Sequence, residues 1–271
     1  MIGCLEKMIT EWRNPVTYAL RVGEQEAPLN PLLGRALRLR YTGRIFCVHC
    51  GGKTKKSYNQ GYCYPCFIKL AQCDRCITQP ELCHYAAGTC REPEWGDKFC
   101  NQPHTVYLAN SSGLKVGITR DSQIPTRWMD QGAAQALPIL RAASRYISGL
   151  AEVALAKRVS DKTNWRQMLK QAPPALDLPA LRDSLLGECA AELARIRAEH
   201  GEQSLIPAEA EPLEIVYPVL NYPDKLKSYD LEKTETVSGI LHGVKGQYWL
   251  LDGGVINIRK YTGYEVEFHF E

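Results

Sequence analysis

The chain has 271 residues, of which 45% are hydrophobic, and a net charge of +3. This length and composition allow a buried core in one large domain or in two to three small ones. The first 20 residues lack the basic start and apolar run of a secretory signal, and no stretch of about 18 apolar residues is present, which argues against a secreted or membrane-spanning protein. We therefore expect a soluble, cytoplasmic protein.

The small net charge hides an uneven distribution of charged residues along the chain. Residues 27–73 carry eight Lys or Arg and no Asp or Glu, and residues 105–170 carry ten basic and four acidic residues. Residues 171–271 carry nine basic and seventeen acidic residues. A basic face formed by the earlier segments would suit a polyanion such as nucleic acid. Basic residues scattered over a solvated surface are the alternative, which charge alone leaves open.

The N-terminal part of the chain predicts β-structure. Apolar and polar residues alternate in TYALRV (residues 17–22) and RALRLRYTGRIFC (residues 35–47), as in strands with one buried face. We describe residues 1–46 as an N-terminal β region.

Residues 47–104 contain nine of the eleven cysteines. In a cytoplasmic protein such clustering indicates metal binding rather than disulfides. Two CxxC pairs, separated by twelve residues, open the segment. Each pair closes a tight turn around one ion, so together they complete a tetrahedral Zn²⁺ site with no open position for water. The sequence predicts a structural zinc ribbon with the ligands Cys47, Cys50, Cys63 and Cys66.

The later cysteines of this segment predict a second structural zinc site. A third CxxC pair supplies two ligands, and further cysteines or a histidine supply the other two, while one thiol can remain free. The CxxC pair is Cys73 and Cys76, the first choices for the other ligands are Cys90 and Cys100, and the alternatives are Cys83 and His84.

The loop between the first two CxxC pairs is basic and aromatic. It contains Lys53, Lys55 and Lys56, followed by Tyr58 and Tyr62. Zinc ribbons often present such residues to phosphates and bases, so we expect a nucleic-acid contact here. A loop that only increases solubility is the alternative.

Residues after the cysteines predict a compact α/β unit. TVYLA and LKVGIT, joined by the turn-forming NSSG, indicate a β-hairpin over residues 105–119. A helix is expected to start near Pro125 and to end at Gly132. LPILRAASR (residues 137–145) indicates a further strand, and SGLAEVALAKRV (residues 148–159) a further helix.

The second of these helices carries a carboxylate on its apolar stripe. Ser148 is its expected N-cap, and Glu152 shares a face with Leu155, Ala156 and Val159. A carboxylate in such a place needs a partner, although it can also simply favour the positive end of the helix dipole.

The remaining residues complete an α+β fold. The Pro-rich stretch at 171–179 indicates a linker, and residues 181–201 an amphipathic helix; together they belong to a linker and helix region at 171–212. Short β runs with Gly-containing turns make residues 213–271 a C-terminal antiparallel β module.

The unit at residues 105–170 resembles the GIY-YIG nuclease superfamily, in particular its phage and bacterial branch with KxGxT in place of the second tyrosine motif. Tyr107 in TVY matches the first motif, Lys115 begins KVGIT, Arg127 matches the helix arginine, and Glu152 the metal-binding glutamate. The whole chain, with its cysteine-rich region ahead of this core, also resembles a bacterial family of proteins of unknown function.

The sequence departs from the GIY-YIG pattern at two positions. Lys115 replaces the second tyrosine, and Gln131 stands where the superfamily has His or Tyr one turn after the arginine. Each matched residue also has a purely structural interpretation, such as cross-strand packing for Tyr107 and a solvated helix surface for Arg127.

The resemblance implies metal-dependent phosphodiester hydrolysis. One Mg²⁺ or Mn²⁺ on Glu152 would bind the scissile phosphate, and Arg127 would hold a phosphate oxygen. Tyr107 would orient or deprotonate the attacking water, with the Lys115 ammonium lowering its pKa. Gly117 would let the phosphate approach the strand.

The leading hypothesis is therefore a zinc-containing, divalent-metal-dependent nuclease acting on DNA or RNA, with Arg120 and the three loop lysines as further nucleic-acid contacts. The alternative is a non-catalytic, zinc-containing nucleic-acid-binding protein, for example one that binds structured RNA. A zinc-stabilised protein-interaction scaffold is the third hypothesis, and it predicts no affinity for nucleic acid at low salt.

Overall fold

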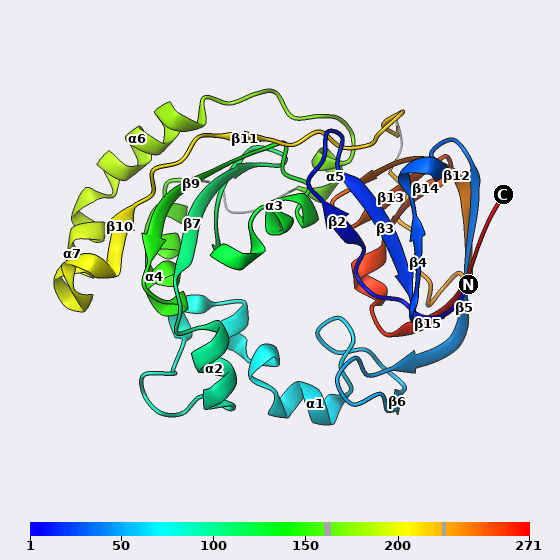
Figure 1. The fold of residues 1–271 in the computed structure, drawn as a ribbon, viewed down its shortest axis with the longest axis horizontal. Helices are drawn as coiled ribbons and strands as arrows, with labels where there is room; N and C mark the ends of the chain where they lie inside the picture. Colours follow the sequence, from blue (N-terminus) through cyan, green and yellow to red (C-terminus); the bar gives the residue numbers. More distant parts are fainter. Residues whose placement is uncertain (160–163, 224–225) are drawn as a thin grey trace.

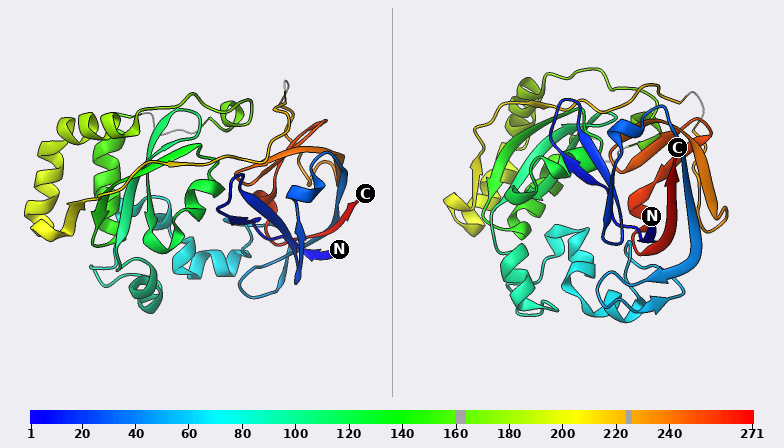
Figure 2. Two further views of the ribbon diagram at one scale, coloured as in Figure 1. Left: turned by 45° about the horizontal axis from the view of Figure 1, so that its top comes forward. Right: turned by 45° about the vertical axis from the view of Figure 1, so that its right-hand side comes forward.

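The computed structural model describes residues 1–159, 164–223 and 226–271. The protein is an α+β structure with three antiparallel sheets, arranged as two lobes that the cysteine-rich segment connects (Figure 1). We call the lobe that contains β1–β5 and β12–β15 the β lobe, and the lobe built on β7–β11 the α/β lobe. Both chain termini lie on the β lobe in every view (Figure 2). Within the described ranges, no helix is long and apolar enough to cross a membrane.

The largest sheet joins strands from the two ends of the chain. Its order is β1-β15-β5-β12-β13-β14, and β6 pairs with β5. The N-terminal strands are β1 (Ile2–Cys4), β5 (Ala36–Phe46) and β6 (Lys53–Thr54), and the C-terminal ones are β12 (Thr236–Lys245), β13 (Tyr248–Leu251), β14 (Gly254–Asn257) and β15 (Tyr264–Phe270). Strand β5 lies between β12 and β15, so the two segments that the sequence describes as separate β regions share one sheet.

A smaller sheet packs into the same lobe. Its order is β2-β3-β4, with β2 at Ile9–Glu11, β3 at Thr17–Val22 and β4 at Gln25–Pro28. Alternate residues of β3 are buried, as the sequence pattern predicts. The short helices η1 (Asn30–Leu32) and η7 (Ile258–Tyr261) complete the lobe.

The α/β lobe is built on a sheet of order β10-β9-β7-β8, with β11 also paired to β9. The predicted hairpin is confirmed as β7 (His104–Asn110) and β8 (Leu114–Arg120), and the third strand as β9 (Gln135–Ala142). The remaining strands are β10 (Leu205–Pro207) and β11 (Leu213–Glu214). Because β8 is an edge strand, residues at this edge are within reach of helices from either face.

The two faces of this sheet bury different cores. Val106 and Leu108 pack against α4 (Arg145–Ala156), α6 (Leu178–Glu188) and α7 (Ala190–His200). Tyr107 and Ala109 point to the other face, where α3 (Thr126–Asp130) and the β lobe share one core with them. The alternation of strand side chains thus places Tyr107 between the two lobes. The connecting elements are η5 (Asp121–Gln123), α5 (Trp165–Met168) and η6 (Glu202–Ser204).

Helix boundaries differ from the sequence predictions in two places. The N-cap of α4 is Ser144, whose side chain accepts a hydrogen bond from the N–H of Ile147, and Ser148 lies inside the helix, so the predicted cap was wrong by one turn. The helix predicted over residues 181–201 is divided into α6 and α7 at Cys189, which is buried beneath α4. The change of direction lets both helices cover the same sheet face. The helix near Pro125 is confirmed as α3.

The cysteine-rich segment runs from β5 to β7, from the β lobe to the α/β lobe, along one side of the molecule (Figure 1). It contains short elements only: α1 (Tyr64–Lys69), η2 (Ala71–Cys73), η3 (Arg75–Ile77), η4 (Pro80–Leu82) and α2 (Pro93–Phe99). Segments with so little regular structure are commonly stabilised by cross-links such as metal ions.

Candidate active site and metal centres

Four side chains that the sequence singled out line one cavity of about 530 Å³: Tyr107 of β7, Lys115 of β8, Arg127 of α3 and Glu152 of α4. The β7–β8 pairing brings the first two together, and α3 and α4 lie on opposite faces of the sheet near its β8 edge. We call this space the arginine cavity because three more arginines line it: Arg120, Arg145 and Arg259.

Tyr107 is fully buried at the inner wall of the arginine cavity. Its ring packs edge-on against Trp128, with 5.7 Å between ring centroids, and its hydroxyl donates a hydrogen bond to Oε1 of Gln131 at 3.0 Å. Burial raises the pKa of Tyr107, and the nearby Arg127 only partly opposes this effect. The expected lowering of this pKa by Lys115 is therefore not found, and the hydroxyl stays protonated at neutral pH.

Gly117 faces Tyr107 directly across the β7–β8 ladder. A Cβ at position 117 would lie 2.7 Å from both Cζ and the hydroxyl oxygen of Tyr107, far inside van der Waals contact. Glycine at this position therefore makes room for the tyrosine ring. This reason differs from the expected one, which was close approach of a phosphate.

The arginines of the cavity lie in two mutually repelling pairs. The pKa of Arg259 is lowered by burial and by the positive charge of Arg127, and the pKa of Arg120 is lowered by burial and by Arg145. Adjacent guanidinium groups in a partly desolvated space are unfavourable unless an anion lies between them. The cavity is therefore suited to bind an anion with several charged oxygens.

Two of these arginines were missed by the sequence analysis. Arg145 begins α4 and donates a hydrogen bond to the carbonyl oxygen of Ile77 at 2.6 Å. Arg259 lies in η7 of the β lobe, more than 100 residues from α3 in the chain, and donates to Oε1 of Gln60 in the zinc ribbon at 2.8 Å. No local pattern distinguishes Arg259 from an ordinary surface residue.

Glu152 is the one carboxylate among the described residues that line the cavity. It is half-buried on α4 and close enough to interact electrostatically with Tyr107. A single carboxylate oxygen next to a space that admits water and phosphate is a donor of the type that Mg²⁺ and Mn²⁺ accept. Glu152 thus offers one possible carboxylate ligand, and neither group of three or more possible metal ligands found among the described residues includes it.

A second, larger cavity of about 960 Å³ adjoins the first. The two share Ile77, Thr78, Arg127 and Arg259 in their walls, and the larger one extends towards Cys47 of the zinc ribbon. The two adjoining cavities, which we call the groove, together extend from the β7–β8 edge to the cysteine-rich segment.

The zinc-ribbon cysteines meet as predicted. The sulfur atoms of Cys47, Cys50, Cys63 and Cys66 all lie within 4.8 Å of one another, and those of Cys50 and Cys63 are 3.8 Å apart. Burial alone would raise the pKa of the Cys47 thiol, but hydrogen bonds from the backbone of Cys50 and Cys63 lower this pKa to about 6. Four thiolates in this arrangement can hold a metal ion and fit Zn²⁺.

The lysines of the zinc-ribbon loop lie elsewhere. Lys53, Lys55 and Lys56 are exposed around a separate depression, where the ammonium of Lys56 lies 5.3 Å from the ring centre of Tyr58. None of the three lines the arginine cavity, whereas Arg120 does. The loop lysines can therefore contact only a ligand that extends beyond the groove.

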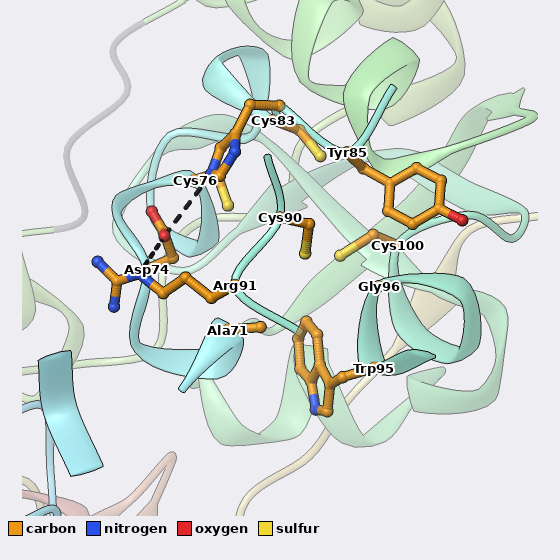
Figure 3. A pocket seen from close by; sticks show the side chains of 11 residues that line it. Ala71, Asp74, Cys76, Cys83, Tyr85, Cys90, Arg91, Trp95, Gly96 and Cys100 are labelled. Carbon is orange, nitrogen blue, oxygen red and sulfur yellow. Dashed lines mark ion pairs between the residues drawn. The ribbon is translucent and has the colours of Figure 1, made fainter. Parts of the chain in front are cut away.

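The five cysteines after the zinc ribbon lie in two different places. Cys76, Cys83, Cys90 and Cys100 line one small cavity, seen from close by in Figure 3. Cys73 is outside that cavity and interacts instead with Asn59 and Cys47 of the zinc ribbon. The Cys73 and Cys76 side chains thus diverge, which differs from the arrangement expected for a CxxC pair. All eleven cysteines are in the described residues, and none forms a disulfide.

Residues 34–266 match the family described as "Protein of unknown function (DUF2797)". No curated protein and no solved structure matches the chain. The matched range includes the residues that line the arginine cavity and both groups of cysteines.

Proposed function

Since the chain belongs to the DUF2797 family, whose description names no activity, we propose a function from the arginine cavity itself. The protein is a divalent-metal-dependent nuclease that hydrolyses phosphodiester bonds in DNA or RNA, with a GIY-YIG-like core and structural zinc.

The observation that carries this proposal is the convergence of Tyr107, Lys115, Arg127 and Glu152 on one cavity that three more arginines line. Hydrolysis of a phosphodiester needs charge stabilisation on the phosphoryl oxygens, a positioned water and a stabilised leaving oxygen. Among its described residues the cavity offers several cationic donors and a single carboxylate, which is the balance that a polyanionic substrate with a hard cation requires.

Several basic side chains of the cavity would bind phosphate together. The guanidinium groups of Arg127 and Arg259 are close enough to repel each other, so a phosphate bridging them relieves this repulsion and accepts hydrogen bonds from both. Lys115 adds a largely buried ammonium to the same wall. When bound at Glu152, Mg²⁺ or Mn²⁺ supplies Lewis-acid stabilisation of the phosphoryl oxygens.

Tyr107 has a different role from the one inferred from sequence. Because its pKa is raised, its hydroxyl acts at neutral pH as a hydrogen-bond donor and orients Gln131 at the cavity wall. Gln131, held by this hydrogen bond, would orient the attacking water, and Tyr107 is a positioning residue.

The order of elements supports the GIY-YIG resemblance. The hairpin β7–β8, helix α3, strand β9 and helix α4 follow one another as the resemblance implies, and the residues matched to its motifs face the same space. These features favour a nuclease over a protein-interaction scaffold, which has no need of a cluster of half-buried arginines.

A second candidate is a nucleic-acid-binding protein that does not cleave. The raised pKa and complete burial of Tyr107 favour this alternative, because they remove as a base the one tyrosine among the described residues that line the cavity. The same groove would then hold a phosphate backbone through its arginines alone.

A panel of labelled single-stranded DNA, duplex DNA and structured RNA distinguishes the candidates. The nuclease predicts salt-sensitive binding and cleavage with Mg²⁺ or Mn²⁺ that stops with EDTA. Salt-sensitive binding without cleavage of any substrate supports the second candidate. The absence of binding at low salt contradicts both.

A further inference from the structure

Four thiols from separated parts of the cysteine-rich segment converge on one point. Cys76 comes from η3, Cys83 follows η4, Cys90 precedes α2 and Cys100 follows it. Figure 3 shows all four sulfur atoms directed into the same small cavity. Their burial ranges from half-buried to nearly complete.

From this convergence we infer that Cys76, Cys83, Cys90 and Cys100 bind a second Zn²⁺ ion in a closed, structural site. Four sulfur donors with no carboxylate or water among them select Zn²⁺ over the hard cations. These thiols are less tightly gathered than those of the zinc ribbon, whose sulfur atoms all lie within 4.8 Å of one another, so an ion would have to draw them together.

A competing donor set shares one of these cysteines. Oxygen, sulfur and nitrogen atoms of Asp74, Cys76 and His84 lie within 4.8 Å of one another. However, Asp74 already forms an ion pair with Arg91, whose Nε lies 2.6 Å from the Asp74 carboxylate, while Nε2 of His84 lies 3.6 Å from that carboxylate. The Asp74–Arg91 ion pair would have to break before the mixed set could bind an ion, which favours the four thiols.

The inferred site also holds one wall of the arginine cavity. The loop at residues 77–82 lies between two of the four cysteines, and it contributes Ile77, Thr78 and Pro80 to the cavity. It packs so closely on α4 that a Cβ at Gly149 would lie 2.6 Å from the backbone nitrogen of Glu81. An ion at the site therefore fixes this loop against the helix that carries Glu152.

Metal analysis of the purified full-length protein tests the inference. We expect two zinc ions per chain in the wild type, and about one after Cys83→Ser. The matched controls Cys73→Ser and His84→Ala should keep two. One zinc per wild-type chain, or loss of one ion in Cys73→Ser or His84→Ala but not in Cys83→Ser, would overturn the proposed ligand set.

X-ray absorption at the zinc edge gives a second measurement on the wild type, which stays decisive if Cys83→Ser does not fold. Two sites of four sulfurs predict a single Zn–S shell at about 2.3 Å. A shell of nitrogen or oxygen at about 2.0–2.1 Å, with imidazole scattering, would instead assign the second ion to the mixed Asp74–Cys76–His84 set.

Discussion

The ring of Tyr107 occupies the space above Gly117, its partner across the β7–β8 ladder, where a Cβ would lie 2.7 Å from the tyrosine hydroxyl oxygen. The missing side chain at one position thus allows the aromatic ring at the other to reach Gln131. A glycine in a strand interior is usually unfavourable, and here Gly117 permits the close approach of the Tyr107 ring.

Gly117→Ala is therefore expected to displace the Tyr107 ring. Forcing a methyl group into this contact should lower the free energy of unfolding by about 1–3 kcal/mol, as overpacking does, and weaken any activity of the cavity. Urea denaturation measures the effect. Gly187→Ala is the control, because nothing lies within 4 Å of a Cβ at that position of α6; it should be neutral or stabilise by about 0.5–1 kcal/mol. Equal effects of the two changes would contradict the packing argument.

Arg259→Met tests whether the charge of Arg259 contributes to nucleic-acid binding in the cavity. Removing this charge should weaken nucleic-acid binding and reduce the slope of log affinity against log salt by about 0.7–0.9. The free energy of unfolding should not fall much, since repulsion from Arg127 and the desolvation of a guanidinium are relieved. Fluorescence anisotropy across a salt series gives the slope.

The neighbouring residue supplies a matched control for that experiment. Lys260 is exposed, lies 3.5 Å from Asp230 and does not line the cavity. Lys260→Met should leave affinity and slope close to those of the wild type. If both variants bind alike, Arg259 makes no phosphate contact.

Lys245 predicts a pH dependence of stability. It is almost fully buried, its ammonium donates to the carbonyl oxygen of Met168 at 2.9 Å, and burial lowers its pKa to about 8 from an ordinary 10.5. The unfolded chain binds more protons than the folded one between these values, so stability rises with pH in this window and is constant below it. At about 1.36 kcal/mol per pKa unit, burial of the charged Lys245 lowers the free energy of unfolding below this window by about 3 kcal/mol.

Chemical denaturation of Lys245→Met beside the wild type between pH 8 and 10.5 measures this term. The stability of the wild type relative to the variant should increase as pH rises. Lys233→Met, which changes an exposed lysine, should show no such difference. A wild type that loses stability relative to Lys245→Met in this window would show that the charge is well accommodated.

Features with a local cause could be predicted from the sequence. Two CxxC pairs enclose one ion whatever surrounds them, and NSSG between two apolar runs makes a hairpin, so the zinc-ribbon cysteines and β7–β8 were found. Motif spacing also indicated that Tyr107 and Glu152 lie near one another, but it could not predict the burial that raises the pKa of Tyr107.

Features with a non-local cause could not be predicted. Arg259 reaches the cavity only because β5 pairs with β12 and β15, strands about 200 residues further along the chain. Spacing alone also does not show where Cys73 lies, since a CxxC pair brings two thiols close in sequence, whereas Cys73 lies near Asn59 and Cys47 and outside the cavity that Cys76 lines. Likewise, the break at Cys189 follows from the sheet face that α6 and α7 must both cover.

The central claim is that Glu152 and the arginines form one hydrolytic site for a phosphodiester. Its most direct test compares cleavage and binding of one labelled substrate, with Mn²⁺, by the wild type, Glu152→Gln and the control Glu209→Gln, an exposed carboxylate after β10. We predict that Glu152→Gln abolishes cleavage and binds at least as tightly, while Glu209→Gln behaves as the wild type. Undiminished cleavage by Glu152→Gln, or no cleavage by the wild type, would contradict the account.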